Sequence, residues 1–155
     1  MKIFLTTLIL TTFTIAQDAH LILNCRAWEN SSRGFDYNDN KVAITLFRNI
    51  AWRNGGVAYK FGMTNHNLIQ NIAIESKRNY ISSNVYQEDN SWNREKYRVA
   101  NDIISFDDSS ISASRDANGT IKRDGFLELK KDTLFFRENI NKKYNRLIEL
   151  IKTNY

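Results

Sequence analysis

The sequence is poor in the residues that mark several common kinds of protein. It has no proline, two histidines, six glycines and one cysteine among 155 residues. A single cysteine cannot form an internal disulfide, so a small disulfide-stabilised secreted scaffold is excluded. None of the glycines opens a helix after a strand, which excludes the usual phosphate-binding loop. No motif in the chain identifies a family.

The composition is that of one folded domain. Hydrophobic residues make up 42% of the chain and charged residues 25%, which argues against disorder and against a polytopic membrane protein. The length suits one domain and is short for two. We therefore expect a single domain over residues 17–155, after a separate N-terminal segment.

Residues 1–16 have the pattern of a secretory signal peptide. Lys2 precedes a run of apolar residues and threonines, and Ala16 ends it with a small residue suited to cleavage. A membrane anchor needs about 20 consecutive apolar residues, whereas Asp18 and His20 follow this run closely. We expect a secreted or periplasmic protein with no transmembrane segment once the signal is removed.

The chain that follows is rich in short β-patterns. Lys41–Arg48 and Val57–Phe61 alternate as strands do, and the intervening Asn54-Gly55 is typical of a hairpin turn. Further β-rich runs cover residues 68–76, 79–86, 103–106 and 126–129. We find no internal repeat. The predicted fold is mainly β (α+β): a single antiparallel β-sheet, a sandwich or a small barrel.

The period changes near the C-terminus. One stripe of apolar residues follows helical spacing, namely Ile140, Tyr144, Leu147, Ile148 and Ile151. This spacing predicts an amphipathic helix over residues 139–152. A helix this short is marginal alone, so we expect it to dock on the sheet, with a membrane-surface helix as the alternative.

Motifs for catalysis and metal binding are missing from the sequence. Asp36 begins a segment that resembles a calcium-binding loop, but Lys41 replaces the turn glycine and Phe47 the bidentate glutamate. His66, in a polar turn, is the better of two candidates for acid–base chemistry, although turn histidines are usually only solvated. We expect no catalytic residue, no metal site and no cofactor.

Two tryptophans in polar surroundings are candidates for binding. Trp28 and Trp92 offer large contact area at little entropic cost, although each can equally cap the end of a sheet. With His66 they form the predicted contact residues. Cys25 lies in a run rich in Leu and Ile and is predicted to be a small buried core residue.

The net charge of +5 is spread among interleaved acidic and basic residues. Nucleic acid is an improbable partner for an exported chain, and an anionic envelope surface fits the charge better. The sequence favours a non-enzymatic binding protein whose partner is a protein or an envelope component. The alternatives are a β-barrel carrier of an apolar ligand and a secreted enzyme of unknown type.

Overall fold

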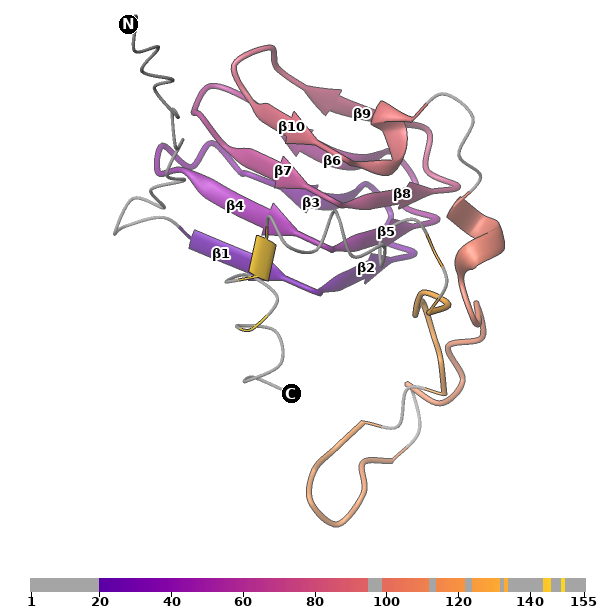
Figure 1. Cartoon of the computed structure of the whole chain (residues 1–155). Coiled ribbons are helices and arrows are strands. Elements are labelled where there is room, and N and C mark those ends of the chain that lie inside the picture. The colour runs from indigo at the N-terminus through magenta and orange to yellow at the C-terminus, as the bar shows by residue number, and fades with distance from the viewer. Residues whose placement is uncertain are drawn as a thin grey trace, which may run out of the picture.

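The strands of this protein wind around a common interior, as a computed structural model shows (Figure 1). The structure describes residues 20–94, 99–111, 114–121, 124–131, 133, 144, 145 and 149. Successive strands join three parallel sheets, A, B and C, in turn. Each circuit through the three sheets is one coil, and the coils stack as a parallel β-helix.

The strands are short and recur in a fixed order. Sheet A contains β1 (His20–Leu23), β4 (Ile44–Phe47), β7 (Asn67–Ile69) and β10 (Tyr86–Glu88). Sheet B contains β2 (Arg26–Trp28), β5 (Ile50–Trp52) and β8 (Ile72–Ile74). Sheet C contains β3 (Arg33–Asp36), β6 (Val57–Phe61) and β9 (Arg78–Ile81). The 3₁₀ helices η1 (Ser91–Asn93) and η2 (Val99–Asp102) follow.

The predicted antiparallel sheet, sandwich or barrel is wrong. All pairs among these ten strands are parallel. The expected hairpin does not form, because β4 and β6 lie in different sheets and Asn54 and Gly55 connect β5 to β6. Alternating side chains have the same period of two in parallel and antiparallel strands. The pattern therefore predicted strands without identifying their partners.

A repeat that we did not find in the sequence underlies the coils. Leu21, Thr45 and Asn67 are aligned in sheet A, and Trp28 is aligned with Trp52 in sheet B. Most equivalent positions share only their polarity, and the C-to-A connections differ in length. Because few residues are identical between coils and their spacing varies, the repeat was not evident from the sequence.

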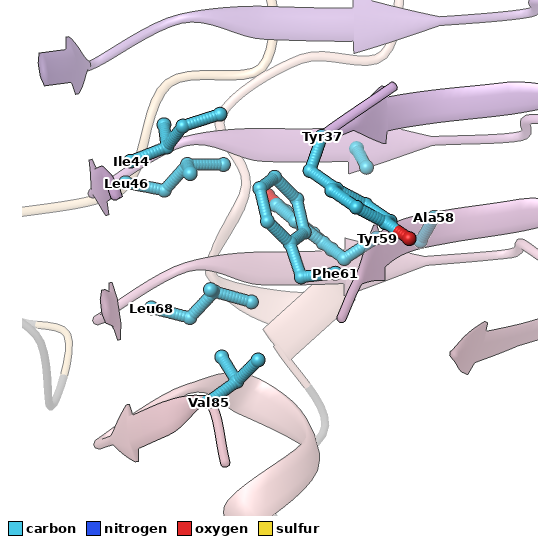
Figure 2. Close-up of a cluster of buried hydrophobic side chains, with 9 residues drawn as sticks. Tyr37, Ile44, Leu46, Ala58, Tyr59, Phe61, Leu68 and Val85 are labelled. Atoms are coloured by element: carbon cyan, nitrogen blue, oxygen red, sulfur yellow. The ribbon is translucent and has the colours of Figure 1, made fainter. Parts of the chain in front are cut away.

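Side chains from all three sheets fill the interior (Figure 2). Leu46, Tyr59, Phe61 and Leu68 are at most 1% exposed. Backbone packing is equally close at Gly34, where a Cβ atom would lie 2.7 Å from the Ala58 carbonyl oxygen. The described coils thus enclose a packed core in place of the ligand pocket expected of a barrel carrier.

A ladder of buried asparagines joins the coils at the turn between sheets A and B. The Asn49 backbone N–H donates to the Asn71 Oδ1 atom at 3.0 Å, and the Asn71 N–H donates to Asn90 Oδ1 at 2.9 Å. Asn71 Nδ2 also donates to the Leu46 carbonyl oxygen at 3.0 Å. All three asparagines are 0% exposed. The ladder therefore satisfies polar backbone groups that would otherwise be buried without partners.

A second apolar cluster covers the outer face of sheet B. Trp52 and Ile72 point away from the interior and pack with Ile103, Phe126 and Leu127. The strands predicted at 103–106 and 126–129 are only isolated bridges, Ile103 with Leu129 and Ser105 with Phe126. The segment after η2 therefore serves as a cover for sheet B.

Two predictions fall mainly outside the described residues. These are the signal peptide at 1–16 and most of the helix at 139–152. Tyr144 is described, is 7% exposed, and lies with its ring 5.6 Å from that of Phe47 on sheet A. Within the described parts of the chain, no helix has the length and apolar character needed to cross a membrane.

Candidate functional site

The three predicted contact residues lie in three different parts of the fold. Trp28 is in β2 on the outer face of sheet B, where its ring is 5.1 Å from that of Phe126. Trp92 is in η1 and packs 4.9 Å from the Tyr59 ring, over one end of the interior. The structure does not bring these side chains together, and their role in binding stays a prediction.

His66 is an interior residue with both ring nitrogens occupied. Its Nδ1 atom accepts from the Ile44 N–H at 3.1 Å, and its Nε2 atom lies 3.1 Å from the Gly62 carbonyl oxygen. Nε2 therefore carries the proton and donates it to Gly62. The side chain is 0% exposed, and burial lowers its pKa while the Gly62 hydrogen bond partly opposes that shift. The solvated turn histidine expected from the sequence is thus a structural group in this fold.

Cys25 also differs from expectation. It is exposed at the turn between β1 and β2, and its backbone N–H donates to Asn49 Oδ1 at 2.8 Å. In the first coil it occupies the position that asparagine fills in the next three. The prediction of a buried core cysteine is wrong. The Leu- and Ile-rich run ends with β1 at Leu23, and Cys25 lies in the turn that follows.

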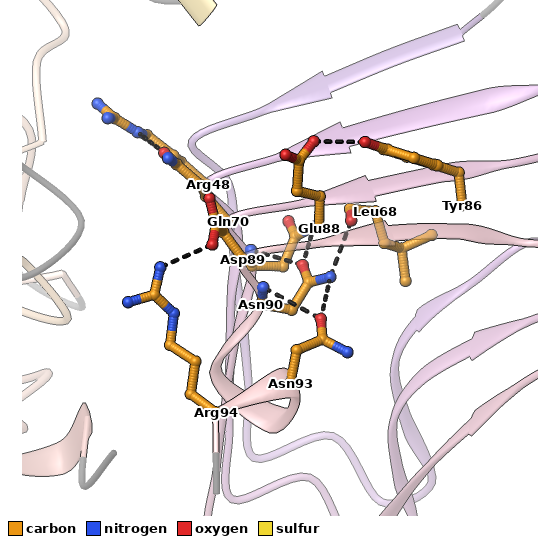
Figure 3. Close-up of polar contacts among 10 residues, drawn as sticks. Arg48, Leu68, Gln70, Tyr86, Glu88, Asp89, Asn90, Asn93 and Arg94 are labelled. Atoms are coloured by element: carbon orange, nitrogen blue, oxygen red, sulfur yellow. Dashed lines mark hydrogen bonds and ion pairs between the residues drawn. The ribbon is translucent and has the colours of Figure 1, made fainter. Parts of the chain in front are cut away.

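A polar cluster at the A–B turn is held by internal bonds (Figure 3). Arg48 Nε donates to Gln70 Oε1 at 2.8 Å, and Arg94 pairs with Asp89 at 2.9 Å. Burial lowers the pKa of Arg48 to about 10. Because these groups bind one another, we assign the cluster a structural role.

Among the described residues, the outer face of sheet C carries the most exposed side chains of the three sheets. Sheet B carries its apolar cover, and Phe47 on sheet A is fully buried beside Tyr144. Sheet C instead presents charged and aromatic side chains in two rows that cross its strands. We define the sheet C surface by these residues: Arg33, Asp36, Lys60, Arg78 and Tyr80.

The net charge of the sheet C surface is positive. Asp36 pairs with Arg33 and lies 4.0 Å from the Lys60 ammonium, so two cations share one carboxylate. Arg78 adds a further exposed cation. Arg33 is exposed while Lys60 and Asp36 are partly buried, and ion pairs near the surface are weak, about 1 kcal/mol or less. The surface therefore suits a polyanion.

Tyr80 adds an apolar platform to this surface. Its side chain is 61% exposed in the middle of β9 and is aligned with Lys60 across the sheet. An exposed aromatic ring next to cations can stack on a sugar ring while the cations bind its acidic group. The arrangement is therefore one that can bind an acidic sugar polymer.

No cluster of three or more His, Cys, Asp or Glu side chains is arranged to hold a metal ion among the described residues. Asp36, where the sequence resembles a calcium loop, accepts the Asn38 backbone N–H at 2.9 Å besides facing its two cations. It therefore belongs to a turn and to the sheet C surface. Sequence reasoning missed Arg33, Lys60 and Tyr80 because only the unrecognised repeat aligns them.

Comparisons with known proteins agree with the fold. No family model matches the chain. It is 34% identical over 110 residues to pectate lyase PEL9 of Emericella nidulans, covering 70% of this chain and 27% of that protein. It is 30% identical over 118 residues to pectate lyase L of Paenibacillus polymyxa, covering 72% and 26%.

A solved structure gives the same result. The crystal structure of pectate lyase Pel9A superposes with a TM-score of 0.64 and 29% identity, over 75% of this chain and 30% of that one. The chain thus spans about a quarter of the length of the curated relatives it matches. These findings contradict our prediction of a non-enzymatic binding protein, because the similar proteins are named as enzymes.

Proposed function

We propose that this chain is part of a secreted pectate lyase and that its sheet C surface binds the pectate chain. The observation that carries the proposal is the likeness to proteins named pectate lyases, over most of this chain and at 29–34% identity. The sheet C surface supports it independently, since pectate is an acidic polysaccharide and the surface combines cations with an exposed tyrosine.

The role assigned to these residues is binding. A lyase that acts on a uronate polymer must remove a proton next to a carboxylate and expel the linked sugar oxygen. Cations that bind carboxylates can hold the polymer across the sheet and position it for that step. We assign Lys60 and Arg33 to the carboxylates and Tyr80 to a sugar ring.

Export completes the proposal. Cleavage after Ala16 delivers the mature chain to the compartment where a plant-derived polymer is met. The intact mass of the protein recovered from the medium or periplasm tests this, because removal of residues 1–16 gives a defined mass. A full-length protein retained in the cell would contradict it.

The binding role predicts the effect of two substitutions. Lys60→Gln removes a charge and Tyr80→Ala removes the exposed ring, and we expect each to weaken binding of oligogalacturonate by roughly 1 kcal/mol, about fivefold. Isothermal titration or affinity electrophoresis measures the change. Lys131→Gln is the matched control, since it removes the same charge from an exposed position beyond the cover of sheet B.

Two outcomes separate the parts of this proposal. Equal affinities for Lys60→Gln, Lys131→Gln and the unchanged chain would remove the sheet C surface as the binding site. The ultraviolet absorbance of unsaturated uronide products tests the lyase activity itself. Binding without product would limit this chain to the recognition of pectate.

A further inference from the structure

The sequence contains two acceptor tripeptides for N-linked glycosylation, each an asparagine followed by any residue except proline and then by serine or threonine. They are Asn30-Ser31-Ser32 and Asn118-Gly119-Thr120. The pattern alone does not distinguish the two asparagines. The structure does, because it places one tripeptide in an outlying turn and stacks the other against the next coil.

The tripeptide at Asn118 belongs to a turn that is held together by its own backbone and by one carboxylate. Asp116 Oδ1 accepts the backbone N–H groups of Asn118 and Thr120, at 2.9 Å and 2.8 Å. The Asp116 carbonyl oxygen accepts the Gly119 N–H at 2.9 Å. Within the described part of the chain, no hydrogen bond involves the Asn118 side chain. Its amide can therefore be modified without the loss of a contact that stabilises the turn.

This turn also lies away from the coils. Residues 114–120 are all exposed. In Figure 1 they belong to the orange loop that follows η2 and extends away from the three sheets. A bulky, hydrophilic glycan at this position has solvent around it and displaces no contact of the packed core or of the sheet C surface.

Asn30 is bonded into the stack of coils. Its Nδ2 atom donates to Asn54 Oδ1 at 2.8 Å, and Asn54 is 2% exposed in the next coil. The Asn30 carbonyl oxygen accepts the Gly55 N–H at 2.8 Å. The two backbones are so close here that a Cβ atom at Gly55 would lie 2.4 Å from the Ser31 carbonyl oxygen. A glycan on Asn30 would have to fit against this buried amide, so it opposes the stacking of the first two coils.

We propose that the secreted protein carries an N-linked glycan on Asn118 and none on Asn30, where export follows a eukaryotic secretory pathway. The donor is an oligosaccharide linked to a lipid through pyrophosphate. A bond forms between Asn118 Nδ2 and C1 of the first sugar, the bond from C1 to the pyrophosphate oxygen breaks, and Nδ2 gives up one proton. The proposal rests on the export proposed above and does not depend on pectate binding.

Expression of the full-length chain in a yeast host tests this modification. We expect the protein in the medium to be heavier than the chain 17–155 by the mass of an oligosaccharide. Peptide:N-glycosidase, which converts a glycosylated asparagine to aspartate, should remove that mass and leave aspartate at position 118 and asparagine at position 30. Secreted protein without a glycan, or with its glycan on Asn30, would overturn the proposal.

Two matched substitutions destroy one tripeptide each and keep both asparagines. Thr120→Ala should give secreted protein without a glycan, whereas Ser32→Ala should leave the glycan in place. Ser32→Thr gives both tripeptides the same third residue and should still leave Asn30 unmodified. A glycan on Asn30 in that variant would show that the third residue and not the fold selects the site, and would overturn the argument from stacking.

A further variant separates this proposal from that of export. In it, the host's own signal peptide replaces residues 1–16. A full-length chain that stays in the cell would contradict export by its own signal. A chain that is secreted behind the host's signal without a glycan on Asn118 would overturn the assignment of the acceptor, and one that carries the glycan there would support it.

Discussion

Three asparagine side chains in this fold have a different role from the one that their residue type suggests in a sequence. In a sequence, asparagine indicates turns and solvent, because its side chain bonds readily to nearby backbone. In this fold Asn49, Asn71 and Asn90 point inward and bond from one coil to the next. The residues were evident from the sequence, but their direction depends on a neighbouring coil about 20 residues away.

Asn71→Ala should therefore be costly. It leaves the buried Asn49 N–H without its acceptor and removes one donor from the Leu46 carbonyl oxygen, so we expect a loss of about 2–4 kcal/mol in the free energy of unfolding. Denaturant titration followed by circular dichroism measures it. Asn118→Ala, in an exposed turn, is the control and should change stability by less than about 0.5 kcal/mol. Equal effects at the two positions would contradict the ladder's role.

The burial of His66 predicts a pH dependence. Its folded-state pKa lies below the unfolded value of about 6.5, so the unfolded chain takes up a proton first as the pH falls. Stability from this group is complete above pH ~6.5 and is lost as the pH falls through that value toward the folded-state pKa.

His66→Asn offers a test, because its amide can accept from Ile44 but does not titrate. We expect the free energy of unfolding of the unchanged chain to fall from about pH 7.5 to 5, and the variant to show a smaller slope. Denaturant titrations at several pH values measure both. Identical slopes would show that another group controls the dependence.

At the scale of the element, the turns account for most of the failed predictions. Arg48, Gln70 and Asp89 have φ angles of 57°, 52° and 54°, in the left-handed region that usually favours glycine. They break what the sequence presents as continuous β-runs, such as 68–76, into two strands of different sheets. Local sequence rules do not predict a left-handed backbone conformation at Gln or Arg. In this fold the asparagine ladder and the stacked coils stabilise it.

The segment that covers sheet B is held in place by side-chain packing and not by regular secondary structure. Phe126 is 2% exposed and meets both Trp28 and Trp52, with ring centroids 5.1 Å and 5.9 Å away. Phe126→Ala should lower the free energy of unfolding by about 3–5 kcal/mol and shift tryptophan fluorescence to the red as water reaches the cluster.

Ile104→Ala is the matched control for that substitution. Ile104 belongs to the same segment but is 54% exposed, so we expect little change in stability or fluorescence. An unchanged emission spectrum for Phe126→Ala would mean that the cover contributes nothing to the environment of these tryptophans.

At the scale of the whole molecule, charge should control the proposed binding. Arg33 and Arg78 of the sheet C surface are exposed and Lys60 is partly exposed, so salt screens these cations over a Debye length of about 10 Å at 0.1 M. We expect the affinity for oligogalacturonate to fall steadily as sodium chloride is raised, and that for a fully methyl-esterified oligomer to be weak and insensitive to salt. Titration calorimetry at several salt concentrations measures both. Equal affinity for the two oligomers would contradict recognition through carboxylates.

The sequence by itself determined that the chain forms short strands, and it located several of them, including much of β4, β6 and β7. Hydrophobic alternation is local, and it survives in any sheet. The tertiary structure alone decided that the strands are parallel, that His66 is buried while Cys25 is exposed, and that Arg33, Lys60 and Tyr80 share one face. Those properties depend on the register between coils, which is set by core packing and by the asparagine ladder over separations of about 20 residues.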